Sequence, residues 1–408
     1  MKGQQENFLT IVRSAIQDEP VKLTEPVDYG RILSLAREQN LLALVGEKLC
    51  ESKDFRLSSE YKQAIADTVG GVTGQTVRTS VFLDLYREFE KAGIHPIVMK
   101  GIVCRELYGK YRDHRPSGDE DLLITKEDFP IMRRVLEAKG FQIERSEVTP
   151  KELEMLQEVT FDQPESGLHI EVHTNPIGKE SGIRRHMNEY FKDVFTKKGA
   201  IEIDGTKIWT MDPTDHFLFL VLHAFKHLMS GGLGIRQALD ICLFYRKYQD
   251  KIEQKYIQES LRQIGAEAFW RDVLYIGRQY LGFVFEEEMS PNCPEELLED
   301  MLDNGIFGNT TQAERTAGSM TTAAVDNREK YTQARAIYRA IFPSKEFMIT
   351  HNPELVESPW LLPFCWAKRW GRFLLHNKGN GGGLAQESIR ISQRRINLLK
   401  KYGVIRNK

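Results

Sequence analysis

The spacing of apolar and polar residues predicts helices at the start of the chain. In residues 28–49 apolar side chains recur at near-helical intervals, and Asp28 is a suitable N-cap in front of them. A second helix is predicted from about residue 58 to Ala92. Three glycines are expected to loosen it: Gly70, Gly71 and Gly74. Residues 1–92 are therefore predicted to form an N-terminal helical region.

The pattern changes at Gly93, where short apolar runs replace the helical periodicity. A hairpin with its turn at Asp204-Gly205 is predicted over residues 201–209. The other predicted strands are His95–Lys100, Asp121–Thr125, Phe141–Arg145, Thr160–Asp162 and Leu168–His173. Helices are predicted over Ile102–Tyr111 and Lys126–Lys139. Residues 93–211 are therefore expected to form a small α/β domain.

Helical periodicity returns at Asp212-Pro213, a pair typical of a helix start, and residues 212–408 are predicted to form a C-terminal helical domain. Gly231-Gly232 should end the first helix, and Ile235–Tyr248 should form the next. Residues 282–325 are weakly patterned and predicted to be rich in loops. Three further segments are interpreted as an aromatic stretch, a flexible linker and a basic helix: Trp360–Leu375, the glycine-rich residues 379–383, and Gln386–Tyr402.

Composition narrows the class of protein only slightly. The 408 residues carry a formal net charge of −2, which gives no general attraction to nucleic acid, although a locally basic groove remains open. Five cysteines without a CxxC pair indicate reduced thiols. The N-terminus has no signal-peptide pattern, and the most apolar run, His216–Phe225, is too short to span a membrane. A cytoplasmic protein is therefore expected.

The most informative residues are two aspartates at the start of a predicted strand. Asp119 and Asp121 are two positions apart, so their side chains share one face. Two carboxylates this close repel each other, and a bound divalent cation such as Mg²⁺ relieves the repulsion. Glu171 alternates with apolar neighbours in a later strand and is a candidate third ligand.

A second group of residues suits a phosphate. Lys100-Gly101 stands where a strand turns into a helix, whose free N–H groups favour anions. Gly101 permits close approach of the backbone. Lys100 and Arg115 add positive charge, and Ser117 lies in the polar loop before the aspartates. Lys100, Gly101, Arg115 and Ser117 are therefore the candidate nucleotide-binding residues.

Each feature taken alone also has an ordinary structural explanation. An isolated Asp-x-Asp is most often a solvated turn or a helix cap, and a glutamate on a strand most often faces water. The combination of Lys-Gly at a strand–helix junction, Asp-x-Asp opening an apolar strand, and a later strand with Glu171 favours metal–phosphate chemistry.

These residues resemble the nucleotidyltransferase superfamily of the DNA polymerase β type, whose pattern is a glycine motif, Asp-x-Asp and a separate acidic strand. The closer resemblance is to an uncharacterised bacterial nucleotidyltransferase family with Lys-Gly in the glycine motif. It covers residues 94–125, 167–175 and 212–244. It implies an α+β protein, in which a minimal nucleotidyltransferase α/β domain with a mixed sheet is flanked by N-terminal and C-terminal helical regions.

The same resemblance implies that Asp119, Asp121 and Glu171 hold two Mg²⁺ ions, with Mn²⁺ as an alternative, and that Gly101 lies beneath a triphosphate. The expected reaction transfers a nucleoside monophosphate, AMP from ATP by default, to an unidentified hydroxyl acceptor with release of pyrophosphate. Glu171 is expected to lie nearest the attacking hydroxyl.

Two other functions remain open. In a metal-dependent glycosyltransferase, Asp-x-Asp would bind the metal of a nucleotide-sugar, although no nucleotide-binding α/β half precedes the motif here. A catalytically degenerate nucleotidyltransferase would act as a nucleotide-binding or interaction protein.

Four features have less specific interpretations. His223 and His227 share a helical face, and with Asp240 they form a weak candidate zinc site; lining the cleft or bonding between helices is favoured. Arg236 and Asp240, four positions apart, suit a helix-face pair or a substrate contact. An aromatic group is best interpreted as packing against the helical domain, with base stacking or contact with a membrane surface as the alternatives: Trp360, Trp366, Trp370 and Phe373, with Lys368, Arg369 and Arg372 between them. A basic group near the C-terminus is best interpreted as a solvated helix face, with RNA binding as the alternative: Arg390, Arg394, Arg395, Lys400 and Lys401.

Overall fold

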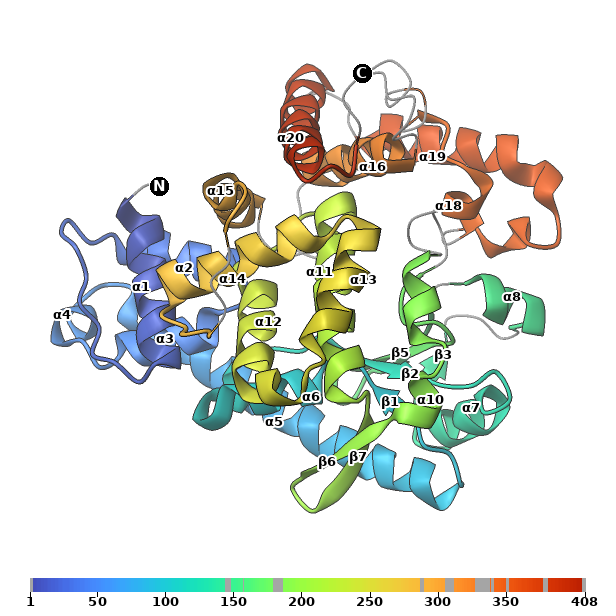
Figure 1. Cartoon of the computed structure of the whole chain (residues 1–408), viewed down its shortest axis with the longest axis horizontal. Helices are drawn as coiled ribbons and strands as arrows, with labels where there is room; N and C mark the ends of the chain where they lie inside the picture. The colour runs from blue at the N-terminus through green and yellow to red at the C-terminus, as the bar shows by residue number, and fades with distance from the viewer. Residues whose placement is uncertain are drawn as a thin grey trace.

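The computed structural model is an α+β fold with one mixed sheet between helical regions (Figure 1). It describes the following residues: 3–143, 148–156, 158–178, 186–286, 290–304, 312–326, 338, 341–349, 352–376 and 381–405. Within these residues, no helix combines the length and the apolar character needed to cross a bilayer.

Within residues 3–92 the helices that precede the sheet are α1 (Gly3–Ile16), α2 (Tyr29–Glu38), α3 (Leu42–Leu49), α4 (Lys53–Arg56) and α5 (Tyr61–Lys91). The predicted cap forms, since the Asp28 side chain accepts a hydrogen bond from the backbone N–H of Arg31 at 2.8 Å. The predicted loosening of α5 was wrong, because the helix is continuous through its glycines. Buried residues recur every seven positions along it, and packing of this face outweighs the low helix propensity of glycine: Thr68, Gln75, Phe82 and Phe89.

Among the described residues, seven strands form the sheet in the order β3-β4-β5-β2-β1-β7-β6. Their bounds are β1 (Ile97–Val98), β2 (Asp119–Leu123), β3 (Gln142–Ile143), β4 (Val159–Gln163), β5 (Leu168–His173), β6 (Gly199–Ile203) and β7 (Thr206–Thr210). β2 pairs with β5, and β1 with β7, in parallel, while the other pairs are antiparallel. The predicted hairpin turn is confirmed by positive φ angles at Asp204 and Gly205.

Short helices connect the strands: α6 (Ile102–Arg105), the 3₁₀ segment η1 (Glu106–His114), α7 (Phe129–Ala138), α8 (Pro150–Met155), η2 (Glu189–Phe191) and α10 (Val194–Lys197). The single helix predicted over Ile102–Tyr111 was wrong. After four residues it becomes 3₁₀, and Gly109 then takes a non-helical φ of 57°.

Helices follow the sheet to the end of the chain: α11 (Pro213–Ser230), α12 (Ile235–Tyr248), α13 (Gln254–Ile264), α14 (Glu267–Leu281), α15 (Pro294–Asn304), α16 (Gln312–Asp326), α18 (Lys345–Ile349), α19 (Leu362–His376) and α20 (Gly381–Lys401), with 3₁₀ turns at Gln249–Lys251, Pro353–Leu355 and Pro359–Leu361. Asp212 caps α11 as predicted, accepting from the backbone N–H groups of Thr214 and Asp215. The loop-rich prediction for 282–325 was wrong, because α15 and α16 occupy much of it. The linker prediction was wrong for residues 381–383, which begin α20, while 379 and 380 lie outside the described residues.

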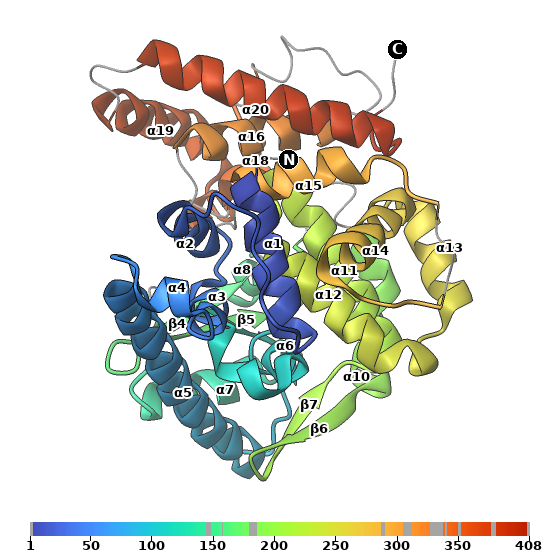
Figure 2. The ribbon, with the colours of Figure 1, turned by 90° about the vertical axis from the view of Figure 1, so that its left-hand side faces the viewer.

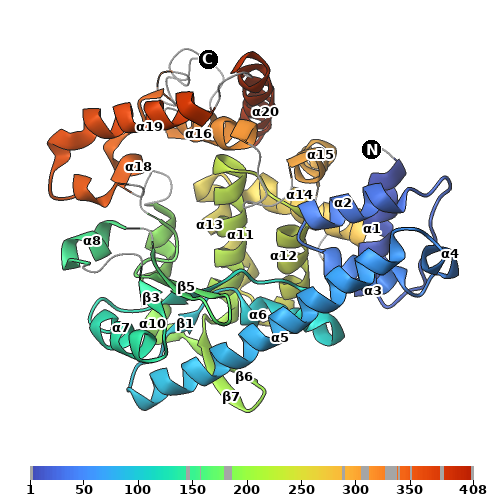
Figure 3. The ribbon, with the colours of Figure 1, turned by 180° about the vertical axis from the view of Figure 1, so that it is seen from behind.

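The two faces of the sheet belong to different cores. Leu122, Ile170 and Val172 pack with α5 and α7. Leu123 projects from the opposite face, into a core that joins α1–α3 to α11–α14. Figures 1 and 3 show α5 and α7 on one side of the strands and α11 and α12 on the other. In the view of Figure 2, α16, α19 and α20 lie at the end of the molecule farthest from the β6–β7 hairpin.

The aromatic segment is packed only in part, where the sequence favoured packing throughout. Trp366 and Trp370 donate hydrogen bonds to the carbonyls of Pro343 and Ile341, whereas Trp360 is 77% exposed. The side chains of Arg372 and Phe373 lie outside the described residues.

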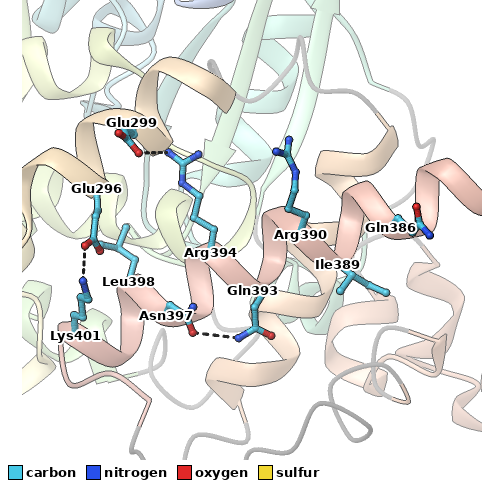
Figure 4. Close-up of a pocket in the computed structure, with 10 residues that line it drawn as sticks. All are labelled: Glu296, Glu299, Gln386, Ile389, Arg390, Gln393, Arg394, Asn397, Leu398 and Lys401. Carbon is cyan, nitrogen blue, oxygen red and sulfur yellow. Dashed lines mark hydrogen bonds and ion pairs between the residues drawn. The ribbon is translucent and has the colours of Figure 1, made fainter. Parts of the chain in front are cut away.

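The basic residues of α20 face acidic residues of α15. Arg394 and Lys401 pair with Asp303 and Glu296, and these two helices border the groove of Figure 4. Arg395 is fully buried beside Asp300, so the prediction of a wholly solvated basic face was wrong.

His216 ties the start of α11 to the end of β1. Its Nε2 donates to the carbonyl of Met99 at 2.7 Å, and burial lowers the pKa of this histidine to about 4. An unfolded histidine has a pKa near 6.5, so the unfolded chain binds the extra proton first as the pH falls. The stability linked to neutral His216 is therefore present above pH 6.5 and is lost progressively towards pH 4.

We expect the wild-type chain to lose about 2 kcal/mol more unfolding free energy than His216→Gln between pH 7 and pH 5. Glutamine keeps an N–H donor but does not titrate. Urea unfolding at the two pH values measures this difference. His95→Gln, at an exposed position, is the control and should respond to pH as the wild type does. An equal loss in His216→Gln and the wild type would contradict the prediction.

Candidate functional site

The register of two parallel strands brings two acidic residues together. Asp121 on β2 pairs with Glu171 on β5, and their side chains project from the face of the sheet that α11 covers. Asp119 lies two residues earlier on that face, opposite His169. We call Asp119, Asp121 and Glu171 the acidic cluster. Asp121 is 4% exposed at its side chain and Glu171 24%, so the cluster is buried at one end and open at the other.

Lys100 supplies positive charge to this cluster. Its Nζ lies 3.1 Å from the carboxylate of Asp121 and donates to Nε2 of His223, on α11, at 3.2 Å. Burial would lower the pKa of Lys100, but the acidic cluster outweighs it and holds that pKa above its ordinary value. Burial, followed by the charge of Lys100, lowers the pKa of His223 well below its usual range, so the imidazole is neutral and accepts the hydrogen bond.

His173 is a third group against the carboxylates. Its Nε2 lies 3.4 Å from Asp121 and 3.6 Å from Glu171. Burial alone would lower the pKa of His173, but the two carboxylates raise it to about 9. For Asp121, burial would raise the pKa, and the charges of Lys100 and His173 lower it below its ordinary value. Asp121 is thus the ionised centre of the site.

Gly101 is required by an internal contact. It has φ 53° and ψ −120°, and a Cβ there would lie 1.8 Å from Oε2 of Glu120. The Glu120 carboxylate accepts from the backbone N–H of Ile102 at 2.8 Å and from Arg105 at 3.0 Å. Burial raises the pKa of Glu120 to about 7. The carboxylate of Glu120 therefore accepts from the backbone at the start of α6.

The loop before β2 is held by α12. Arg115 donates two hydrogen bonds to Asp240, at 2.8 and 2.7 Å, and the hydroxyl of Tyr108 donates to the same carboxylate at 2.7 Å. Arg236 donates to the carbonyl of Pro116 at 3.0 Å. Ser117 donates from its hydroxyl to the carbonyl of Asp119 at 2.8 Å. In this structure Arg115 and Ser117 position the loop that leads into the acidic cluster.

The α11 histidines face the sheet. The rings of His223 and His227 lie 4.5 Å apart between centroids. His223 contacts Lys100, whereas Asp240 contacts Arg115 and Tyr108. In the described residues, His223 and Asp240 of the candidate zinc site therefore belong to two different hydrogen-bond networks. Glu158, just before β4, has its pKa raised by burial and then by the charge of Glu171.

A divalent cation suits the residues beneath α11. One donor atom each from Asp121, Glu171 and His173 lies within 4.8 Å of the other two. Both ring nitrogens of His173 are buried and make no hydrogen bond, so a polar group there has an unused donor atom. Carboxylate oxygens and an imidazole nitrogen are common ligands of divalent metals. Asp119 is not in this group of three, although it lies on the same face.

Comparison with known proteins assigns the chain to a family by its sequence. The sequence model of a family described as "Uncharacterised nucleotidyltransferase" matches residues 25–282. The chain belongs to this nucleotidyltransferase family. No curated protein and no solved structure matches it significantly. The matched residues include the sheet, the acidic cluster and α11–α14, whereas α15 to α20 follow the match.

Two residues near the carboxylates of the acidic cluster were not predicted. His173 stands two positions after Glu171, so alternation along the strand was a usable signal for it. No such pattern indicates Glu158, because it lies just before β4 and not within a strand. Only the folded structure places it near Glu171. Of the seven predicted site residues, Lys100, Asp121 and Glu171 are shown together by contact or register, and Asp119 shares their face.

Proposed function

We propose that this chain transfers a nucleoside monophosphate from an NTP, with ATP as the default, to a hydroxyl group and releases pyrophosphate. The observation that carries the proposal is the pairing of Asp121 with Glu171 on adjacent parallel strands, beside Lys100 and on the face shared by Asp119. Membership of a nucleotidyltransferase family supports the same reaction class.

Asp119, Asp121 and Glu171 would hold divalent cations, two Mg²⁺ ions in the expected case. Such cations, when bound, neutralise charge on a triphosphate and lower the pKa of a hydroxyl group. Lys100 now balances Asp121, and its ammonium group becomes free to bind a phosphate oxygen when another cation balances that carboxylate. Gly101 keeps the backbone beside Lys100 free of a side chain.

The acceptor oxygen forms a bond to the α-phosphorus, and the bond from that phosphorus to the bridging oxygen breaks. Pyrophosphate leaves with the electron pair. Glu171, the most exposed member of the pair with Asp121, takes the proton of the acceptor hydroxyl. Ser117 and Arg115 act indirectly by fixing the loop before Asp119. Most of the rate enhancement comes from alignment and fixed charge.

The experiment compares two positions of one label. The full chain is incubated with Mg²⁺ or Mn²⁺, a fractionated cell extract as the acceptor source, and ATP labelled at either the α- or the γ-phosphate. We expect the α label in a new product and the γ label in pyrophosphate, in equal amounts. The other three NTPs, tested in parallel, give the base preference.

Three results would contradict the proposal. Transfer of the γ label to an acceptor would indicate a kinase. Hydrolysis of a UDP-sugar without NTP turnover would indicate a glycosyltransferase. Binding of NTP in calorimetry, without turnover in any fraction, would indicate a nucleotide-binding module.

A further inference from the structure

His173 is placed by β5 to face the same space as Glu171. The two residues are separated by Val172, so they project from one face of the strand. His173 is opposite Leu123 in the register with β2, one step beyond the pair formed by Asp121 and Glu171. The strand pairing therefore fixes the imidazole at the buried end of the acidic cluster.

The ring of His173 is buried and makes no hydrogen bond. The residue is 4% exposed, its Nε2 has only the two carboxylates at ion-pair distance, and its Nδ1 makes no hydrogen bond either. Other histidines of this region do make hydrogen bonds: His216 to the carbonyl of Met99, and His169 to Asp162. A buried polar nitrogen without a hydrogen bond costs about 1–3 kcal/mol, so this arrangement is explained when a ligand occupies the space in front of the ring.

The nitrogen nearest the carboxylates has the distances of a metal ligand set. Nε2 lies 3.4 Å from Oδ1 of Asp121 and 3.6 Å from Oε2 of Glu171. Donor atoms around one cation are themselves about 3 Å apart when each lies about 2.1 Å from the ion. A cation among these three atoms would satisfy the imidazole and both carboxylates without a change in the strand pairing.

We propose that His173 is a metal ligand, which with Asp121 and Glu171 makes one cation site of mixed nitrogen and oxygen donors that favours a transition-metal ion such as Mn²⁺ over Mg²⁺. This inference rests on the proposed function and specifies the metal of the same site. Mg²⁺ strongly prefers oxygen ligands, whereas an imidazole nitrogen suits the first-row transition metals. Asp119 is outside this group of three donors, two residues before Asp121 on the same face of the sheet.

Nitrogen coordination has a direct spectroscopic signature. Pulsed electron paramagnetic resonance of the full chain loaded with Mn²⁺ should show ¹⁴N modulation from a directly bound imidazole. Labelling histidine with ¹⁵N should change that modulation, so the wild-type protein alone decides whether a histidine is bound. His173→Gln should abolish the signal, and His169→Gln, a change on the same strand at a half-exposed histidine, should retain it.

Affinity gives a second measurement. Titration of free Mn²⁺ by its room-temperature resonance should give a dissociation constant about tenfold or more weaker in His173→Gln than in the wild type. His173→Asp replaces the nitrogen with oxygen, so we expect Mg²⁺ to displace Mn²⁺ from it more readily than from the wild type. Circular dichroism establishes that each variant is folded.

The outcomes separate this inference from the proposed function. Bound Mn²⁺ without histidine modulation, in a protein whose affinity still falls in Asp121→Asn, would overturn the role of His173 and leave the acidic cluster as a metal site. Unchanged Mn²⁺ affinity in both His173→Gln and Asp121→Asn, or no Mn²⁺ binding at all, would overturn both proposals.

Discussion

Replacement of Asp121 with asparagine should lower the rate of NTP-dependent pyrophosphate release by about a hundredfold to a thousandfold. Asp121 is the carboxylate that contacts Lys100, faces Glu171 in the register and lies beside His173. Asparagine fills the same volume but removes the charge that would hold a divalent cation. The effect should therefore be on turnover far more than on folding.

Pyrophosphate release at saturating Mg²⁺ or Mn²⁺ measures this effect, with thermal melting as the check on folding. Asp162→Asn is the matched control: Asp162 lies on the neighbouring strand β4 and is 45% exposed, outside the acidic cluster. Its activity should stay within about twofold of the wild type, because surface charges away from a site contribute little. Asp119→Ala combined with Asp121→Ala should bring release to the background rate. Parental activity in that double variant would show that the chemistry lies elsewhere.

The sequence predicted helices and strands correctly where the local signals, such as caps and apolar periodicity, were strong. The ends of β5 and α12 fall at the predicted residues, and Asp28 and Asp212 cap their helices. Residues 312–326 gave no such signal, because α16 is rich in alanine, threonine and other small residues. At Gly318 a Cβ would lie 1.8 Å from the carbonyl oxygen of Ser230, so close packing of this helix, absent from any local pattern, holds it in place.

In the candidate site, too, local patterns predict some features, whereas others depend on contacts between distant segments. Alternation along a strand placed Asp119 and Asp121 on one face, and the same reasoning extends to Glu171 and His173. The pairing of β2 with β5 depends on how segments about fifty residues apart meet, and no local pattern fixes that register; only the family resemblance implied that Glu171 joins the two aspartates. Arg115 was assigned to phosphate for its charge, yet it makes a bidentate pair with Asp240 from α12. Charge predicts what a residue prefers to contact, whereas the fold determines which partner is within reach.

The second large effect is expected from a substitution of Gly101. The carboxylate of Glu120 occupies the space that a Cβ at this position would need, so this glycine has a structural role independent of any nucleotide. Alanine there would place a Cβ 1.8 Å from a carboxylate oxygen that is buried and bonded to Ile102 and Arg105. Either Glu120 moves and leaves Arg105 unpaired, or the start of α6 moves. Breaking a buried ion pair costs about 3–5 kcal/mol, and the backbone conformation of Gly101 costs alanine a further 1–3 kcal/mol or so. We therefore expect Gly101→Ala to lower the unfolding free energy by about 4 kcal/mol or more, measured by urea denaturation.

Gly109 provides a control with the same backbone conformation. Its φ of 57° and ψ of −121° nearly equal those of Gly101, but nothing lies within 4 Å of the position its Cβ would take. Gly109→Ala should therefore cost only the backbone strain, about 1–3 kcal/mol. The difference between the two variants measures the contact with Glu120 alone. Equal losses in the two variants would mean that backbone conformation, and not the buried carboxylate, requires glycine after Lys100, and the place of Gly101 beside a triphosphate would then regain its importance as an explanation.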